Sequence, residues 1–216
     1  MKQGALTTGK FITLEGIEGS GKSLQLSALE EEFTRMEVPY LVTLEPGGTR
    51  FGREVRNVLL QTRGAPREPL SELLLYLADR YQHLQEIVEP ALQKGTHVVS
   101  DRYHDATVVY QGYARGIGFR LVEQLAELLN IRRPDLTLVL DIDPKVGLSR
   151  ARARNSSENT EELGRFEAED LAFHERVREG YRLLAGQEPE RVVMVDGRGS
   201  PEEVFQRLWP LVRGLL

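Results

Sequence analysis

The sequence contains no cysteine, and it also lacks the long apolar runs of secreted and membrane-spanning chains. Without cysteine there can be no disulfide, no zinc–thiolate site and no thiol nucleophile, so any catalysis must use other groups. Residues 1–10 are polar and carry no apolar core of the signal-peptide kind. The longest apolar stretches are strand-length or amphipathic, far shorter than a bilayer crossing. We therefore expect a cytoplasmic protein with no membrane partner.

Positive charge is also in short supply. The chain has 28 Lys and Arg against 33 Asp and Glu, a net charge of -5. A surface that binds a nucleic acid polymer usually carries a basic excess, so we expect no such partner. Of the basic residues 23 are Arg and 5 are Lys, and Arg grips phosphate through two parallel hydrogen bonds. A preference for Arg codons explains most of that ratio, but a small anionic substrate could still be held locally.

The chain alternates between short β-rich runs and helical patterns, as expected of one α/β domain over residues 1–216. The expected strands are residues 11–15, 40–44, 97–100, 136–141 and 191–195. The expected helices are residues 22–36, 52–61, 69–93, 120–129, 144–154, 165–185 and 201–215, with Pro90 kinking or ending the third. Residues 155–164 are polar and indicate a surface loop. The nearly continuous apolar strands favour a parallel sheet covered on both faces.

One glycine-rich segment follows the first expected strand and opens the first expected helix. It reads Gly16, Ile17, Glu18, Gly19, Ser20, Gly21, Lys22, Ser23 and matches GxxxxGK[ST], the P-loop pattern. Its amides and the helix N-terminus suit the phosphates of ATP; Lys22 would reach the β- and γ-phosphates and Ser23 would bind Mg²⁺. The alternative is a glycine-rich turn with a chance Lys, which the strand and helix context disfavours.

A P-loop alone fits GTPases, motor and transport ATPases and small-molecule kinases, so other residues must discriminate. Asp101 ends the third expected strand, where it could hold Mg²⁺, and Arg102 follows it. Further segments occur in this order: Glu45-Pro46-Gly47-Gly48-Thr49, residues 76–80, Asp101-Arg102-Tyr103, Tyr110-Gln111-Gly112, residues 133–137 and residues 150–154. With the loop, this set resembles the thymidylate kinases along essentially the whole chain.

Thymidylate kinases transfer the γ-phosphoryl group of ATP to thymidine monophosphate (dTMP). The resemblance implies a P-loop three-layer sandwich, in which helices flank a five-stranded parallel sheet, with ATP and Mg²⁺ required and a homodimer formed. It implies that dTMP is bound by Glu18, Glu45, Tyr76, Arg80, Arg102, Thr107, Tyr110 and Gln111. The donor side would comprise residues 16–23 and Arg150, with Ser23 and Asp101 as the metal ligands.

Each acceptor residue has a role implied by the resemblance. Arg102 would grip the acceptor phosphate with Arg80 nearby, and two guanidinium groups can neutralise a phosphate dianion. Tyr76 would stack on the thymine ring, although an aromatic on that helix face could equally belong to the core. Glu18 would meet the 3′-hydroxyl, unless it is a solvent-facing loop carboxylate. The base edge and the sugar 2′ position would be lined by Thr107, Gln111 and Tyr110.

Arginines bracket the polar loop, which suits a lid over residues 150–165. Arg152 and Arg154 precede it and Arg165 follows it. Such a lid brings positive charge onto the transferring group and excludes water. Family members supply the catalytic Arg from the P-loop or from the lid. The loop here carries none, so the resemblance implies the bacterial type, with Lys22, Arg102 and one of the lid arginines as catalytic residues.

Two other functions remain open at this point. The first is a kinase of the same fold that acts on another nucleotide or nucleoside, which Glu18 and Asp101-Arg102-Tyr103 disfavour. The second is a nucleotide-dependent switch, for which the sequence has no Asn-Lys-x-Asp segment. Departures from the family pattern include Leu44, where many relatives have Arg, and Gly164, where an Asp often precedes the lid Arg.

Overall fold

The centre of the molecule is a five-stranded sheet in the order β2-β3-β1-β4-β5, with every neighbouring pair parallel. The computed structural model describes residues 8–61, 67–157 and 165–216, with the backbone alone over 154–157. The strands are β1 (Phe11–Glu15), β2 (Tyr40–Leu44), β3 (His97–Asp101), β4 (Leu136–Asp141) and β5 (Val192–Asp196). The expected parallel sheet is therefore confirmed, with two strands ending one residue later than predicted.

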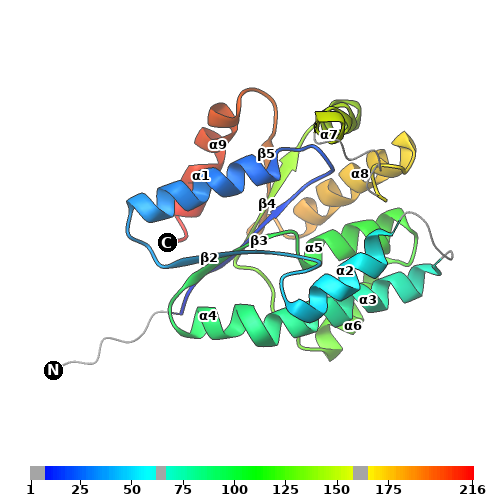
Figure 1. Cartoon of the computed structure of the whole chain (residues 1–216), viewed down its shortest axis with the longest axis horizontal. Helices are drawn as coiled ribbons and strands as arrows, with labels where there is room; N and C mark the ends of the chain where they lie inside the picture. Colours follow the sequence, from blue (N-terminus) through cyan, green and yellow to red (C-terminus); the bar gives the residue numbers. More distant parts are fainter. Residues whose placement is uncertain (1–7, 62–66, 158–164) are drawn as a thin grey trace.

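Helices cover both faces of the sheet, which gives three layers (Figure 1). On one face, α1 (Lys22–Arg35) and α9 (Pro201–Arg213) bury Leu29, Phe33 and Leu208 in one apolar cluster with Ile12 and Leu14 of β1. On the other face the covering elements include α8 (Leu171–Gln187) and the π-helix η2 (Val108–Ala114). Because β1 side chains alternate between the faces, Glu15 points to the side of α8.

The remaining helices are α2 (Arg50–Leu60), α3 (Pro69–His83), the π-helix η1 (Leu84–Val88), α4 (Glu89–Gln93), α5 (His104–Thr107), α6 (Phe119–Leu128) and α7 (Pro144–Ser157). Of these, η1, α4 and α6 pack on the same face of the sheet as α8, against Phe11 of β1 and Val98 of β3. None of the described helices combines the length and the apolar composition that a bilayer crossing requires.

The helix expected over residues 69–93 is divided into three segments. The α-helix ends at His83, η1 makes a wider turn, and α4 continues past Pro90 to Gln93. Proline has no N–H for an intrahelical bond, so helical hydrogen bonding cannot run unchanged through it. In η1 the N–H of Glu89 bonds to the carbonyl of Leu84 instead, a wider i→i+5 pattern. The chain therefore stays helical across Pro90.

The segments on either side of the expected lid also differ from the prediction. Residues 155–157 continue α7 rather than starting a loop, and 158–164 lie outside the described residues. The helix expected from residue 165 begins only at Leu171. Asp170 caps it by accepting a hydrogen bond from the Phe173 N–H at 2.7 Å, so the helix starts where its first amides find a partner. Arg165 therefore lies in a turn before α8.

Candidate active site

The P-loop connects β1 to α1 at the carboxyl edge of the sheet. Gly16, Gly19 and Gly21 have φ of 134°, 70° and 98°, which only glycine adopts without strain. At Gly19 a Cβ would also collide with the carbonyl oxygen of Gly147, since α7 packs directly against the loop. The spacing of glycines in the sequence is therefore explained by backbone conformation and by close packing.

The loop leaves donors available for an anion. Gly21 occupies the N-cap position of α1 and has no side chain to cap the helix, so the first-turn amides face outward. Lys22 folds back and donates from Nζ to the carbonyl oxygens of Gly16 at 3.2 Å and Ile17 at 3.1 Å. Burial lowers the pKa of Lys22 to about 8. A polyphosphate in the loop would supply the negative charge that this buried ammonium group lacks.

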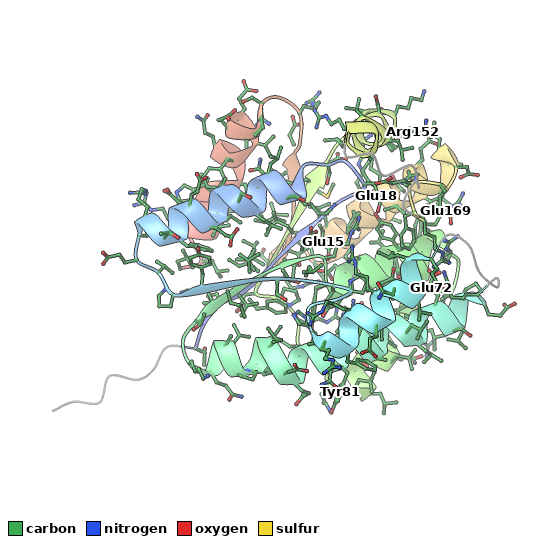
Figure 2. The ribbon with its side chains drawn as sticks, viewed as in Figure 1. Glu15, Glu18, Glu72, Tyr81, Arg152 and Glu169 are labelled. Carbon is green, nitrogen blue, oxygen red and sulfur yellow. The ribbon has the colours of Figure 1, made fainter. Side chains whose placement is uncertain are left out.

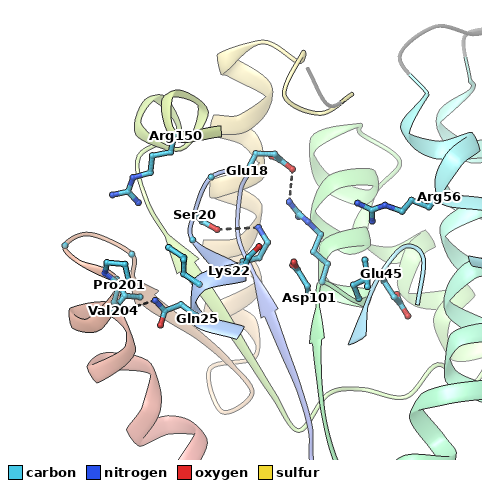
Figure 3. Close-up of a pocket in the computed structure, with 18 residues that line it drawn as sticks. Glu18, Ser20, Lys22, Gln25, Glu45, Arg56, Asp101, Arg150, Pro201 and Val204 are labelled. Carbon is cyan, nitrogen blue, oxygen red and sulfur yellow. Dashed lines mark hydrogen bonds and ion pairs between the residues drawn. The ribbon is translucent and has the colours of Figure 1, made fainter. Parts of the chain in front are cut away.

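A cavity of about 720 Å³ opens above the loop (Figure 3). Arg150 of α7 lies on one side of it and Arg56 of α2 on the other, with Lys22 and Asp101 between them. Ser23 lines the same cavity, and Asp101 Oδ1 is buried with no hydrogen-bond partner among the described residues. An orphaned carboxylate oxygen near a loop hydroxyl fits Mg²⁺, which keeps several waters and substrate oxygens as ligands. The expected donor-side residues thus line one cavity or form the loop beneath it.

A second, smaller cavity of about 230 Å³ adjoins the first. Its walls come from α2, α3, α5, η2 and the turn before α8. The residues that line both cavities are Glu18, Glu45, Arg56 and Arg102. Two anionic groups could therefore approach each other at these side chains, one from each cavity.

Arg102 occupies the junction. Its Nη2 donates to Glu18 Oε1 at 2.7 Å, and its guanidinium lies 4.8 Å from the ring centroid of Tyr110. The Tyr110 hydroxyl reaches both carboxylate oxygens of Glu18 at 3.1 Å. Burial opposes ionisation of Glu18, but Arg102 outweighs it together with His174 and Lys22, so the pKa falls to about 2. The loop carboxylate is thus an ion-pair partner of the acceptor-side arginine rather than a solvent-facing group.

A buried carboxylate, that of Glu15, holds the backbone next to Arg102. Arg102 has φ 65° and donates its N–H to Leu14 O at 2.9 Å. Glu15, the last residue of β1, accepts hydrogen bonds from the N–H of Tyr103 at 2.8 Å and from the Tyr181 hydroxyl at 2.7 Å. Burial raises the pKa of Glu15 to about 7, although Arg102 acts against that shift. This network ties the backbone after β3 to the strand that carries the P-loop.

Arg80 is fixed on three sides within the second cavity. Its Nε donates to Glu45 at 2.8 Å, and its Nη2 donates to Tyr103 O and to the Thr107 hydroxyl, both at 2.9 Å. Its Nη1 is buried and has no hydrogen-bond partner in the described part of the chain. A buried donor without a partner is costly unless a ligand supplies an acceptor. Arg80 lines this cavity, and the two N–H groups of its Nη1 are available to an acceptor group.

Tyr76 and Gln111 form an aromatic wall and an amide in the lining of the second cavity. Tyr76 lines the cavity and also packs with Val55 and Leu59, so its ring belongs to both the core and the site. Gln111 lines the cavity and donates from Nε2 to Glu72 Oε1 at 2.9 Å. The expected acceptor residues, Glu18, Glu45, Tyr76, Arg80, Arg102, Thr107, Tyr110 and Gln111, all line this one cavity.

The lid arginines do not converge. Arg165 forms an ion pair with Glu72 and donates to Leu59 O at 3.0 Å, which places it in the acceptor cavity. Arg152 is exposed on α7, beside Glu169 and Asp170 in a separate cavity (Figure 2). The side chain of Arg154 lies outside the described residues. Their catalytic role stays a prediction.

Several residues of the site were not predicted from the sequence. Arg56 lines both cavities and donates to Pro46 O at 2.7 Å. Its position in the second turn of α2, the helix that follows the Gly47-Gly48-Thr49 turn, was an available signal. Glu15, Glu72 and His174 gave no signal of this kind, because their roles depend on contacts far apart in the sequence.

A P-loop fold in which the donor cavity adjoins a second cavity lined by arginines is that of a nucleotide phosphotransferase. The model of the thymidylate kinase family matches residues 14–208. The thymidylate kinase of Syntrophotalea carbinolica is 48% identical over 200 residues, covering 92% of this chain and 93% of that protein. That of Nitratidesulfovibrio vulgaris (strain Miyazaki F) is 48% identical over 208 residues, covering 95% and 97%. The chain belongs to the thymidylate kinase family.

A solved structure agrees with this assignment. The crystal structure of thymidylate kinase from Ehrlichia chaffeensis superposes with a TM-score of 0.76 at 30% sequence identity. The alignment covers 95% of this chain and 99% of that one.

Proposed function

We propose that the chain transfers the γ-phosphoryl group of ATP to the 5′-phosphate of dTMP, giving dTDP and ADP. The observation that carries this proposal is the position of Arg102 between the two cavities, where it can neutralise an acceptor phosphate that faces the P-loop. Family membership supplies the identity of the acceptor. An oxygen of the acceptor phosphate attacks the γ-phosphorus in line while the bond to the β-phosphate oxygen breaks. The attacking oxygen of the acceptor phosphate is already anionic, so no general base is needed.

The chain's own residues hold the two reactants end to end. The amides of the P-loop and Lys22 bind the donor phosphates, and Arg102 exchanges its partner Glu18 for the acceptor phosphate. Glu18 then accepts a hydrogen bond from the 3′-hydroxyl of the acceptor sugar. Ser23 and Asp101 would hold Mg²⁺, which would supply positive charge to the donor oxygens. Arg56, which faces both cavities, is a further candidate to hold the acceptor phosphate.

The acceptor base is held by a ring and by directed polar groups. Tyr76 offers its face to the flat pyrimidine. Arg80 Nη1 would donate to a base carbonyl, and Gln111 would bond the base edge. The side chain of Tyr110, held by Glu18, would crowd a ribose 2′-hydroxyl and so favour a deoxyribose.

A panel of acceptors tests the proposal. ADP formation is followed with a coupled assay in the presence of ATP, Mg²⁺ and one monophosphate at a time. ADP should form rapidly only with dTMP, and deoxyuridine monophosphate should be a poorer acceptor. Equal ADP formation without any acceptor would support a hydrolysing switch instead, and a preference for a purine monophosphate would support the other kinase reading.

A homodimer is also part of the proposal. Exposed apolar side chains recur on α3 at Leu70, Leu74 and Tyr81, which share one helix face, and on α2 at Phe51 and Val58. Light scattering should give twice the 24.5 kDa of one chain, and a mass of one chain would contradict the dimer. A cytoplasmic location stays a prediction.

A further inference from the structure

Gln111 is held in one orientation by a carboxylate that lies behind it. Its Nε2 donates to Glu72 Oε1 at 2.9 Å, and both side chains are 2% exposed. A carboxylate accepts hydrogen bonds and donates none, so the amide must turn its nitrogen toward Glu72. The amide oxygen then points the other way, on a side chain that lines the acceptor cavity.

Glu72 itself is anchored by two guanidinium groups. Arg165 forms an ion pair with Glu72 Oε2, and Arg115 Nε lies 3.8 Å from Oε1. Arg115 is in turn held by Glu169 at 2.6 Å. A buried carboxylate with these partners has its charge compensated and its position fixed. Rotating the Gln111 amide by half a turn would place Oε1 against this carboxylate, which is unfavourable.

The orientation of the amide matters for the base that it meets. Thymine presents a donor at N3 beside an acceptor at O4, whereas cytosine presents an acceptor at N3 beside a donor at N4. An amide that offers its oxygen to N3 and its second N–H to O4 matches thymine. Cytosine in the same position requires the reversed amide, which Glu72 opposes.

We propose that Glu72 is a specificity-determining positioning residue: by fixing the amide of Gln111, it makes the acceptor cavity select a base with an N3–H over cytosine. This inference rests on the proposed function. Arg80 Nη1, a buried donor in the same cavity, adds its own preference for a carbonyl at C4. The contribution of Glu72 is therefore one part of the selection.

The test compares dTMP with 5-methyldeoxycytidine monophosphate, because these two nucleotides differ only at the N3 and C4 edge. Calorimetry gives the two dissociation constants for the natural chain and for Glu72→Gln, in which Gln111 can turn either way. We expect the preference for dTMP to fall about tenfold in Glu72→Gln, in line with the discrimination carried by one paired hydrogen-bonding edge. Glu169→Gln is the matched control, since it disturbs Arg115 without touching Gln111, and it should keep the preference.

A double-mutant cycle separates positioning from a general structural effect. In a Gln111→Leu background, Glu72→Gln should change the preference no further, because the amide that Glu72 orients is gone. An unchanged preference in folded Glu72→Gln, or an equal fall in the Gln111→Leu background, would overturn the inference. ADP formation with dTMP is measured in parallel. A chain that binds dTMP selectively without forming ADP would refute the kinase reaction, while the binding ratios would still decide the role of Glu72.

Discussion

The donor and acceptor cavities are built in different ways. The phosphate-binding part of the donor cavity comes from one continuous segment, residues 16–23, and offers mainly backbone amides. The acceptor cavity takes side chains from α2, α3, α5, η2 and the turn before α8. Its polar groups are held by buried partners, such as Glu45 for Arg80 and Glu72 for Gln111.

This difference shows how each cavity achieves its selectivity. A phosphate chain is the same in every nucleoside triphosphate, so amides and a helix N-terminus are sufficient to bind it. A particular base must be distinguished by donors and acceptors in fixed directions, which requires buried polar networks that are fully paired. The donor cavity should therefore depend on a few residues near the phosphates, and the acceptor cavity on many small contributions.

The largest effect is expected on the donor side. Lys22→Ala removes the buried ammonium group that now bonds to Gly16 O and Ile17 O. The variant should fold, because the glycines set the loop conformation, but turnover with dTMP should fall roughly a thousandfold. The coupled ADP assay measures this, with the exposed Lys94→Ala as control. Natural turnover in purified Lys22→Ala would refute the phosphate role of the loop.

The second effect concerns stability at the junction. The pKa of Glu15 is raised from 4.5 to about 7, so between these pH values the folded chain binds more protons than the unfolded chain. The free energy of unfolding contributed by Glu15 therefore falls as pH rises through this window. Glu15→Gln removes the cost of ionising a buried carboxyl group. The free energy of unfolding of the variant, relative to that of the natural chain, should therefore increase by roughly 3 kcal/mol from pH 4.5 to 7.

Urea unfolding at several pH values measures this difference. Tyr181→Phe is the matched control, because it removes one hydrogen bond to Glu15 and keeps the carboxyl group; it should retain the pH trend of the natural chain. A difference between Glu15→Gln and the natural chain that stays constant with pH would show that Glu15 ionises normally in the fold.

The smallest effect is expected at the aromatic wall of the acceptor cavity. Tyr76→Leu removes a ring that is 8% exposed and faces the site. The KM for dTMP should rise about fivefold, since base stacking on one ring contributes about 1 kcal/mol. The KM for ATP should stay the same, and Tyr76→Phe, which keeps the ring, should behave like the natural chain. Equal increases for both substrates would assign Tyr76 to the core alone.

The sequence was sufficient for the sheet and the phosphate loop, because both depend on local patterns. Apolar β-rich runs placed all strands within one residue, and the glycine spacing located the loop. The wide turn η1 was missed inside a predicted helix, since its composition does not differ from that of an α-helix, and the helical segment over residues 104–114 (α5 and η2) was not predicted at all. The start of α8 could have been found, because Asp170 is a good N-cap residue.

The buried carboxylates could not be predicted. A glutamate in a helical or strand pattern is normally exposed, yet Glu15 is 0% and Glu72 is 2% exposed. Their partners, Tyr181 and Gln111, lie 166 and 39 residues away in the sequence. The acceptor residues that the resemblance implied do line one cavity, but the groups that orient them became visible only in three dimensions.

The ion pair between Glu18 and Arg102 supplies an internal counter-ion when no acceptor is bound. An incoming anion must separate Arg102 from this partly buried carboxylate, which keeps the Tyr110 hydroxyl but loses the guanidinium that balances its charge, at a cost in free energy. The sugar hydroxyl of a nucleotide offers Glu18 a replacement partner, whereas inorganic phosphate or sulfate brings none. Small anions should therefore bind Arg102 weakly, because they cannot replace it as the partner of Glu18, whereas a nucleotide can.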